Sequence, residues 1–203
     1  MSAARSTTMA VLIAVALVAG TLHLKQATPH PTNGDAACAN AHTFGSLDEA
    51  TKTADTACTI QAHNQGLTTV PPQIGNLHAV RNLNLSHNSL AQLPPEMGWL
   101  KELRVLDVSY NSLATVPGQV GWFRKMTTIN LSHNELTKLP AEIGWWGEVR
   151  DVDLSYNHLA TLPAVVHQWT KLEKINLAHN DFSPTELDKI KGWLPATTTI
   201  ITE

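Results

Sequence analysis

Histidine and aspartate side chains, which bind metals and transfer protons, recur at a fixed spacing in this chain. His87, His133 and His179 follow one another at intervals of 46 residues. Asp107 and Asp153 have the same separation. If each interval holds two units stacked as neighbouring strands about 4.8 Å apart, like residues lie about 10 Å from each other. Because ligands of one zinc ion lie about 2 Å from it, this spacing excludes a shared zinc site.

Carboxylate pairs are the other candidates for catalysis. The separation of about 10 Å between Asp107 and Asp153 is slightly beyond the roughly 6.5 to 9.5 Å of inverting glycosidases. Asp151 and Asp153 share one strand face about 7 Å apart, but the sequence offers no neighbour that would make either a general acid. Ser86 and His87 are adjacent, so their side chains point to opposite faces of a strand. We therefore predict a protein that is not an enzyme and that needs no cofactor or metal.

The elements that position these residues are repeats. The motif LNLSHNSLAQLP at residues 83–94 returns as LDVSYNSLATVP, INLSHNELTKLP and VDLSYNHLATLP. Its central asparagine recurs every 23 residues, at Asn88, Asn111, Asn134, Asn157 and Asn180. A fixed period of this length predicts a solenoid, in which successive turns stack over one continuous core.

One unit, residues 80–102, predicts the path of the chain through each turn. Leu83 and Leu85 alternate with polar residues up to Ser86, the pattern of a short strand whose polar side chains face out. The asparagine that follows can satisfy backbone groups where the chain leaves the sheet, so stacked turns would form a structural asparagine ladder. Leu93 and Pro94 then suit an outer segment, since proline has no N–H to donate to a sheet.

The consensus LxxLxLSxNxLxxLPxxIGxL resembles the leucine-rich repeat, specifically the 23-residue type with Leu-Pro and Ile-Gly that is found in bacterial and Ras-group repeat proteins. Five to six copies cover residues 57–183. The first copy has Ala62 for leucine and Gln65 for asparagine, so we expect this copy to be a degenerate repeat at the edge of the stack or part of a cap. The resemblance implies an α/β solenoid: a curved stack with short parallel strands on its concave face and helical caps at both ends. It also implies recognition of a partner instead of catalysis.

Polar and aromatic residues would form two columns across the concave face. We predict that they bind a protein partner, as such faces do in repeat proteins. The alternative is that these residues are exposed but bind no partner. They would then recur only because an ancestral pair of repeats, 46 residues long, was duplicated. The predicted partner-binding residues are Asn84, His87, Asp107, Tyr110, Asn130, His133, Asp153, Tyr156, Asn176 and His179.

Three tryptophans that each follow a glycine form a candidate aromatic stripe on the convex side: Trp99, Trp122 and Trp145. They precede an inward series that is expected in the core: Leu100, Phe123, Trp146 and Trp169. These tryptophans either cover the convex surface of the stack or bind a sugar polymer or a second protein. The sequence leaves these alternatives open.

Both ends of the stack are predicted to carry caps. Residues 46–56 read as an N-terminal cap helix, because Ser46 and Glu49 form a capping box. Residues 184–203 read as a C-terminal cap, with Ser183 as N-cap, Pro184 at the first helical position and a β-rich edge strand at the end. Residues 26–45 are predicted to form a flexible linker.

Residues 1–25 have the outline of a secretory signal, with Arg5 before an apolar run at 9–19 and small residues at 18–20. The apolar segment of about 16 residues is shorter than a spanning helix of roughly 20. We predict a cleaved signal peptide and an exported protein, with an uncleaved single-pass anchor as the alternative. Cys38 and Cys58 are the only cysteines, and a disulfide is expected in an oxidising compartment, with a buried thiol as the alternative.

Composition limits the class of partner. The 203 residues are 43% hydrophobic and 15% charged, as in folded proteins, and the net charge is -3. No basic stripe is present to neutralise phosphates, so nucleic acid is not expected as a partner. We predict a non-enzymatic module that binds a protein on its concave sheet. The alternatives are binding of a cell-surface glycan by the tryptophan stripe, or a membrane-tethered signalling or structural scaffold.

Overall fold

The computed structural model describes residue 38 and residues 42–52 and 57–203. The chain divides into two units, Met1–His30 and Pro31–Glu203, and every described residue belongs to the second. The predicted signal or anchor segment, residues 1–25, and most of the predicted linker lie outside the described residues. None of the helices in the described ranges is long and apolar enough to span a membrane.

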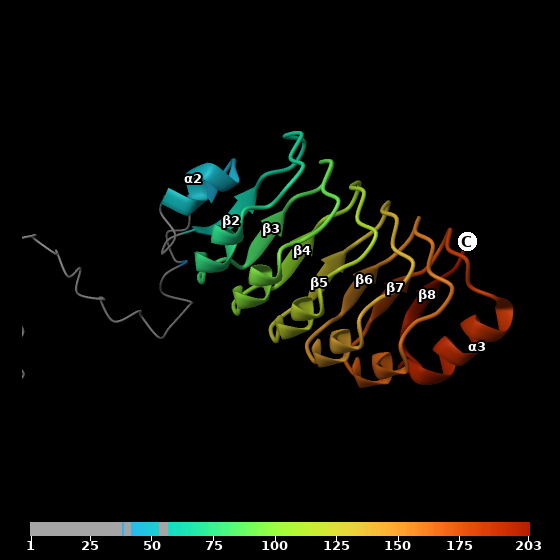
Figure 1. Cartoon of the computed structure of the whole chain (residues 1–203). Coiled ribbons are helices and arrows are strands. Elements are labelled where there is room, and N and C mark those ends of the chain that lie inside the picture. Colours follow the sequence, from blue (N-terminus) through green and yellow to red (C-terminus); the bar gives the residue numbers. More distant parts are fainter. Residues whose placement is uncertain (1–37, 39–41, 53–56) are drawn as a thin grey trace, which may run out of the picture. The chain divides into compact units, whose positions relative to one another are not determined.

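A single parallel sheet of eight strands runs through the described unit, and the strand order follows the chain (Figure 1). Between residues 59 and 176, neighbouring strands pair in a constant register with partners 23 residues apart, so that Leu83 lies beside Leu106 and Leu106 beside Ile129. Residues 23 apart therefore form columns across the sheet. The strands are β1 (His42–Phe44), β2 (Ala57–Gln61), β3 (Asn82–Asn84), β4 (Val105–Asp107), β5 (Thr128–Asn130), β6 (Asp151–Asp153), β7 (Lys174–Asn176) and β8 (Thr199–Ile201).

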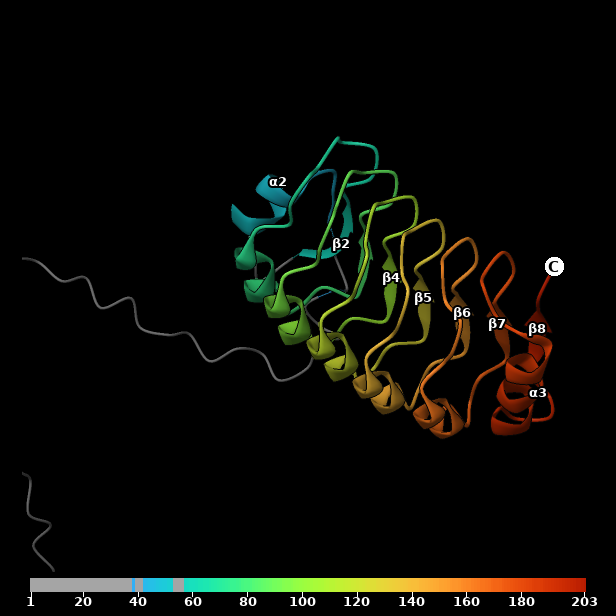
Figure 2. The same cartoon turned by 45° about the vertical axis from the view of Figure 1, so that its right-hand side comes forward.

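A row of short 3₁₀ helices, one in each turn, forms the other side of the stack (Figure 2). Each begins directly after a proline with extended backbone, for example Pro94 with φ -72° and ψ 144°. Proline fixes φ and lacks an N–H, so it suits the residue before a helix at this outer position. The helices are η1 (Pro72–Asn76), η2 (Pro95–Trp99), η3 (Gly118–Trp122), η4 (Ala141–Trp145) and η5 (Ala164–Gln168).

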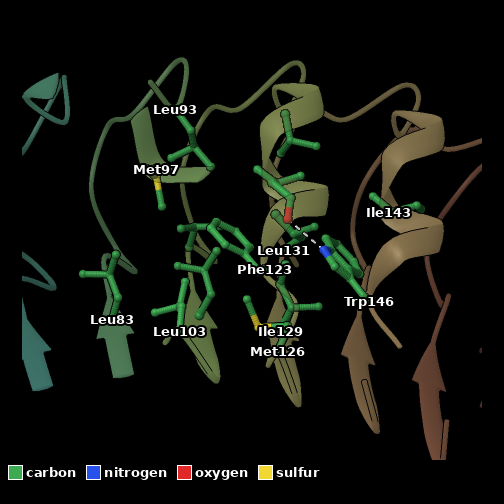
Figure 3. Close-up of a cluster of buried hydrophobic side chains, with 14 of the residues drawn as sticks. Leu83, Leu93, Met97, Leu103, Phe123, Met126, Ile129, Leu131, Ile143 and Trp146 are labelled. Atoms are coloured by element: carbon green, nitrogen blue, oxygen red, sulfur yellow. Dashed lines mark hydrogen bonds between the residues drawn. The ribbon is translucent and has the colours of Figure 1, made fainter. Parts of the chain in front are cut away.

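A continuous apolar core fills the space between the strands and the 3₁₀ helices. Leu83, Met97 and Phe123 are buried there with their counterparts in the other turns (Figure 3). The indoles of Trp146 and Trp169 are also fully buried. Each indole Nε1 donates to the carbonyl 26 residues earlier, at 2.8 Å in both cases, and the bond of Trp146 is drawn in Figure 3. These bonds satisfy the only polar atom of each indole and join successive turns.

Helical segments lie at both ends of the stack. Helix α2 (Leu47–Lys52) begins after Ser46, whose Oγ accepts the Glu49 N–H at 3.2 Å. Helix α3 (Pro184–Trp193) begins after Ser183, whose Oγ accepts the Glu186 N–H at 3.1 Å. Strand β8 then forms the last edge of the sheet.

One boundary predicted from the sequence is wrong. Residues His42–Phe44 were assigned to the flexible linker, but they form strand β1 beside β2. Phe44 is buried in the core, and the side chain of Gln65 donates to the Gly45 carbonyl. The atypical first copy of the repeat is thus tied to the chain before it, and a three-residue strand is too short to show an alternating pattern.

A disulfide joins Cys38 and Cys58, which are 20 residues apart, and Cys58 is buried on β2. Reducing it is expected to lower the free energy of unfolding by about 3 kcal/mol, because the bond restricts the unfolded chain. Thermal unfolding with and without reductant measures the change. Labelling of unfolded, unreduced protein should detect no free thiol, and two labelled thiols would contradict the disulfide.

Candidate binding surface

In strands β3 to β7, the last outward side chain closes a tight turn. Asn84 Oδ1 accepts from the Ser86 backbone N–H at 2.9 Å and from its hydroxyl at 2.7 Å. Asp107 Oδ1 makes the same two bonds to Ser109, at 2.9 and 2.7 Å. One oxygen of each such side chain therefore fixes the chain as it leaves the sheet.

This turn corrects the prediction that Ser86 faces out with the polar residues of the strand. Ser86 is only 5% exposed, and its counterparts Ser109, Ser132 and Ser155 are also buried. The reason is that the strand ends at Asn84, so the alternation of faces does not continue to Ser86. The buried hydroxyl of Ser86 has the Asn84 oxygen as its hydrogen-bond partner.

Amides and carboxylates alternate along this column. Asp107 lies between Asn84 and Asn130 in the sheet register. Asp153 lies beside Asn176, whose Nδ2 donates to Asp153 Oδ2 at 3.2 Å. Like charges directly opposite each other on neighbouring strands are destabilising. The alternation therefore keeps two carboxylates on the sheet without placing them side by side.

A second column consists of five stacked aromatic rings, which we term the ring column: His87, Tyr110, His133, Tyr156 and His179. Successive ring centroids lie 3.9 to 4.2 Å apart. Because each inner ring has a neighbour on both faces, the column presents ring edges to solvent. Those edges carry imidazole nitrogens and phenol hydroxyls, which can donate and accept hydrogen bonds. Tyr110 and Tyr156 remain 45% and 46% exposed.

Every residue of the ring column has a left-handed backbone, with φ between 52° and 53°. Bulky side chains rarely adopt this conformation, because the Cβ crowds the following carbonyl. Asn64 takes the same place in the first turn with φ 59°, and asparagine tolerates it well. The two tyrosines are therefore held at positions where asparagine would fit more easily, whereas histidine adopts this conformation more readily, and backbone strain of this kind is common at functional sites.

The backbone strain can be separated from the ring contacts with two variants of Tyr110. Tyr110→Asn and Tyr110→Val both lose the contacts to His87 and His133. Only asparagine tolerates the left-handed backbone, so we expect the valine variant to unfold with a free energy about 1 to 2 kcal/mol below that of the asparagine variant. Denaturant unfolding measures the difference. Equal stabilities would show that φ at this position costs nothing.

The five asparagines after the ring column bind the backbone of two turns each. Asn134 Nδ2 donates to the carbonyls of Val108, Leu131 and Ser132, each at 3.1 Å. Its Oδ1 accepts the Leu113 N–H at 3.0 Å. The same four bonds recur at Asn111, Asn157 and Asn180, while Asn88 Oδ1 accepts two N–H groups in the first turn. Every one of these side-chain bonds runs within the residue's own turn or to the preceding one.

Comparison with known proteins shows which fold this arrangement of strands and asparagines matches. Residues 78–136 match the family model described as leucine rich repeat. The solved structure of a leucine-rich repeat protein of Leptospira interrogans is 28% identical, with a TM-score of 0.60 over 75% of this chain and 45% of that chain. The stack is a leucine-rich repeat solenoid.

A second solved structure shares the leucine-rich repeat fold. A chain of the Toll–Spatzle complex of Drosophila is 23% identical, with a TM-score of 0.62 over 73% of this chain and 20% of that chain. This chain spans less than half the length of either of the two proteins. None of the curated protein sequences compared with it matches.

On the helical side of the leucine-rich repeats, three exposed tryptophans form a row that we term the indole row: Trp99, Trp122 and Trp145. Each is the last residue of its 3₁₀ helix. The inward residues that follow them, such as Trp146, are fully buried. The structure thus separates the two tryptophan series, one on the surface and one in the core.

Ion pairs also join successive leucine-rich repeats. Lys125 lies 2.7 Å from Glu102, and Lys171 lies 2.6 Å from Glu148. The hydrogen bond from Lys171 holds the pKa of the Glu148 carboxyl below its ordinary value. These side chains are a quarter to a half exposed, and ion pairs at the surface contribute little to stability. Within the described ranges, no group of three or more His, Cys, Asp or Glu side chains is placed to hold a metal ion.

Proposed function

We propose that this leucine-rich repeat stack is a non-enzymatic module that binds a protein partner on its sheet face. The observation that carries the proposal is the ring column, in which five aromatic rings are stacked at left-handed backbone positions with their polar edges exposed. Aromatic residues are enriched among the residues that dominate protein interfaces. A rigid column also loses little conformational entropy when a partner binds.

The column beside the rings supplies hydrogen bonds for the same partner. Asp107 uses Oδ1 in its turn, and among the described residues its Oδ2 has no hydrogen-bond partner. The alternation of Asn and Asp adds carboxylates at every second turn, so a partner with donors or cations spaced by about 10 Å would match them. The Toll–Spatzle complex, which shares the fold, is itself a complex between proteins and supports a protein as the partner class.

Quantitative capture from the medium and envelope of the source cells, followed by crosslinking, tests this proposal. The variant Tyr110→Asn/Tyr156→Asn alters the sheet face with residues that the backbone tolerates. The matched control Trp99→Ala/Trp122→Ala removes two aromatic residues of similar exposure, 48% and 41%, from the helical side. We expect a protein that wild type and control capture equally and that the tyrosine variant captures at least about tenfold less. Equal capture by all three would contradict a partner on the sheet face.

We also propose that the protein is exported, because disulfides persist in oxidising compartments. The intact mass of the protein from its own cells tests this proposal. Loss of about 20 N-terminal residues would identify a cleaved signal peptide. A full-length mass in the membrane fraction would instead support the tethered scaffold.

A further inference from the structure

We propose that the indole row is a second binding site, separate from the sheet face, for an extended chain of neutral sugar rings. Trp99, Trp122 and Trp145 are 48%, 41% and 44% exposed, although tryptophan is usually well buried. They occupy the same position in three successive turns. Asn76 precedes them and Gln168 follows them at that position, so the aromatic row is three rings long.

The indoles are held in place by the turns beneath them. A Cβ added to Gly75 would lie 2.9 Å from Trp99 Cε3, and one added to Gly98 would lie 3.1 Å from Trp122 Cε3. Trp99 and Trp122 therefore each pack directly against a glycine of the preceding turn. The guanidinium carbon of Arg124 lies 5.0 Å from the centroid of the Trp145 ring. Side chains fixed in this way lose little conformational entropy when a ligand binds.

The size of the row favours a narrow ligand. If each indole exposes a little under half of roughly 250 Å², the three together present about 300 Å². A standard protein interface buries about 800 Å² on each partner. The row is one ring wide and three turns long, so its shape matches a linear chain better than a globular protein surface.

The neighbours of the indoles determine the chemistry of the ligand. The backbone carbonyl oxygen and Cβ of Glu96 lie beside the same glycine as Trp99, and those of Gln119 lie beside the same glycine as Trp122, so an acidic and an amide side chain begin next to the first two indoles. A pyranose ring has a face of C–H groups that packs on an indole, and hydroxyls at its rim that bond to carboxylates and amides. No single sign of charge dominates, because Lys101 and Arg124 follow the first two indoles. A neutral sugar fits this mixture, whereas a nucleic acid needs a positively charged groove.

Titration with defined oligosaccharides tests the site. The probes are cellohexaose, chitohexaose and xylohexaose, with oligogalacturonate as the anionic comparison, and the measurements are tryptophan fluorescence and isothermal titration calorimetry. We expect at least one neutral hexasaccharide to bind. Each of Trp99→Ala, Trp122→Ala and Trp145→Ala should then weaken binding by about tenfold or more, since aromatic platforms supply most of the contact.

Two comparisons make the result specific. Tyr110→Asn/Tyr156→Asn, on the sheet face, should bind the sugar as wild type does. The melting temperature of each tryptophan variant should stay close to that of wild type, and the single variants decide the result if the triple variant is unstable. The proposal is overturned if none of the neutral hexasaccharides binds wild type, or if the tryptophan variants bind as tightly as wild type. Neither result would bear on a protein partner at the sheet face.

Discussion

Asn134→Ala is expected to lower the free energy of unfolding by about 3 to 5 kcal/mol, because it removes four hydrogen bonds in a buried turn, each contributing about 1 kcal/mol, and leaves the Leu113 N–H without a partner. Asn134 is only 7% exposed, so water cannot easily replace the lost bonds. Denaturant unfolding monitored by circular dichroism measures the change.

Asn130→Ala is the matched control in the same turn. Asn130 is partly exposed and accepts one bond, from the Ser132 N–H at 3.0 Å, so we expect a loss of about 1 kcal/mol. Asn180→Ala should lie between the two, since Asn180 makes the same bonds as Asn134 but is only partly buried. If Asn134→Ala cost no more than Asn130→Ala, the asparagine ladder would not be an important source of stability.

The second large effect is expected from Gly121→Ala. A Cβ at Gly121 would lie 2.2 Å from the Glu142 carbonyl oxygen and 2.5 Å from its carbonyl carbon. These are backbone atoms of the next 3₁₀ helix, so the two helices would have to separate. We expect a loss of about 3 kcal/mol, at the upper end of the usual cost of overpacking. Thermal and denaturant unfolding both measure it.

Gly147→Ala provides the control, because no atom lies within 4 Å of an added Cβ there. Alanine restricts the unfolded chain more than glycine does, so this variant should be unchanged or more stable by up to about 1 kcal/mol. A similar loss in both variants would mean that glycine at position 121 is not required by the contact with the next turn.

The stacking of the turns could be predicted from the sequence because one number, the 23-residue period, sets which residues are neighbours. Once Asn88 and Asn111 are aligned, all other positions follow, including the burial of Trp146 and the exposure of Trp145. The helix after Ser183 was equally predictable, since its cap signals are local. The first inference needs only the period, and the second needs only the residues at the start of the helix. Neither depends on atomic distances finer than the spacing between strands.

Other features depend on geometry finer than the period. The period aligns the residues of the ring column with one another, but the stacking of Tyr110 on His87 occurs at residues with a positive φ that periodicity does not report. The sequence did contain one indication of the positive φ. Asn64 occupies the equivalent position in the first turn, and asparagine tolerates a left-handed backbone. Burial of Ser86 was missed because the strand ends two residues earlier than the alternation suggested. The close contact at Gly121 depends on tenths of an ångström between backbones.

The asparagine bonds also bear on the order in which the molecule forms. The side chain of Asn134 reaches back 26 residues to Val108 and 21 residues to Leu113, and none of its side-chain bonds involves a later turn, whereas its backbone N–H donates to the Tyr156 carbonyl of the next turn. All inter-turn contacts of this kind are short in sequence, so each turn closes a small loop at low entropic cost. A chain that is synthesised from its N-terminus can therefore fold one turn after another. Each new turn packs against the preceding turn, which is already folded. The N-terminal cap is the natural starting point for this growth, because the disulfide and β1 both join it to β2 in the first turn.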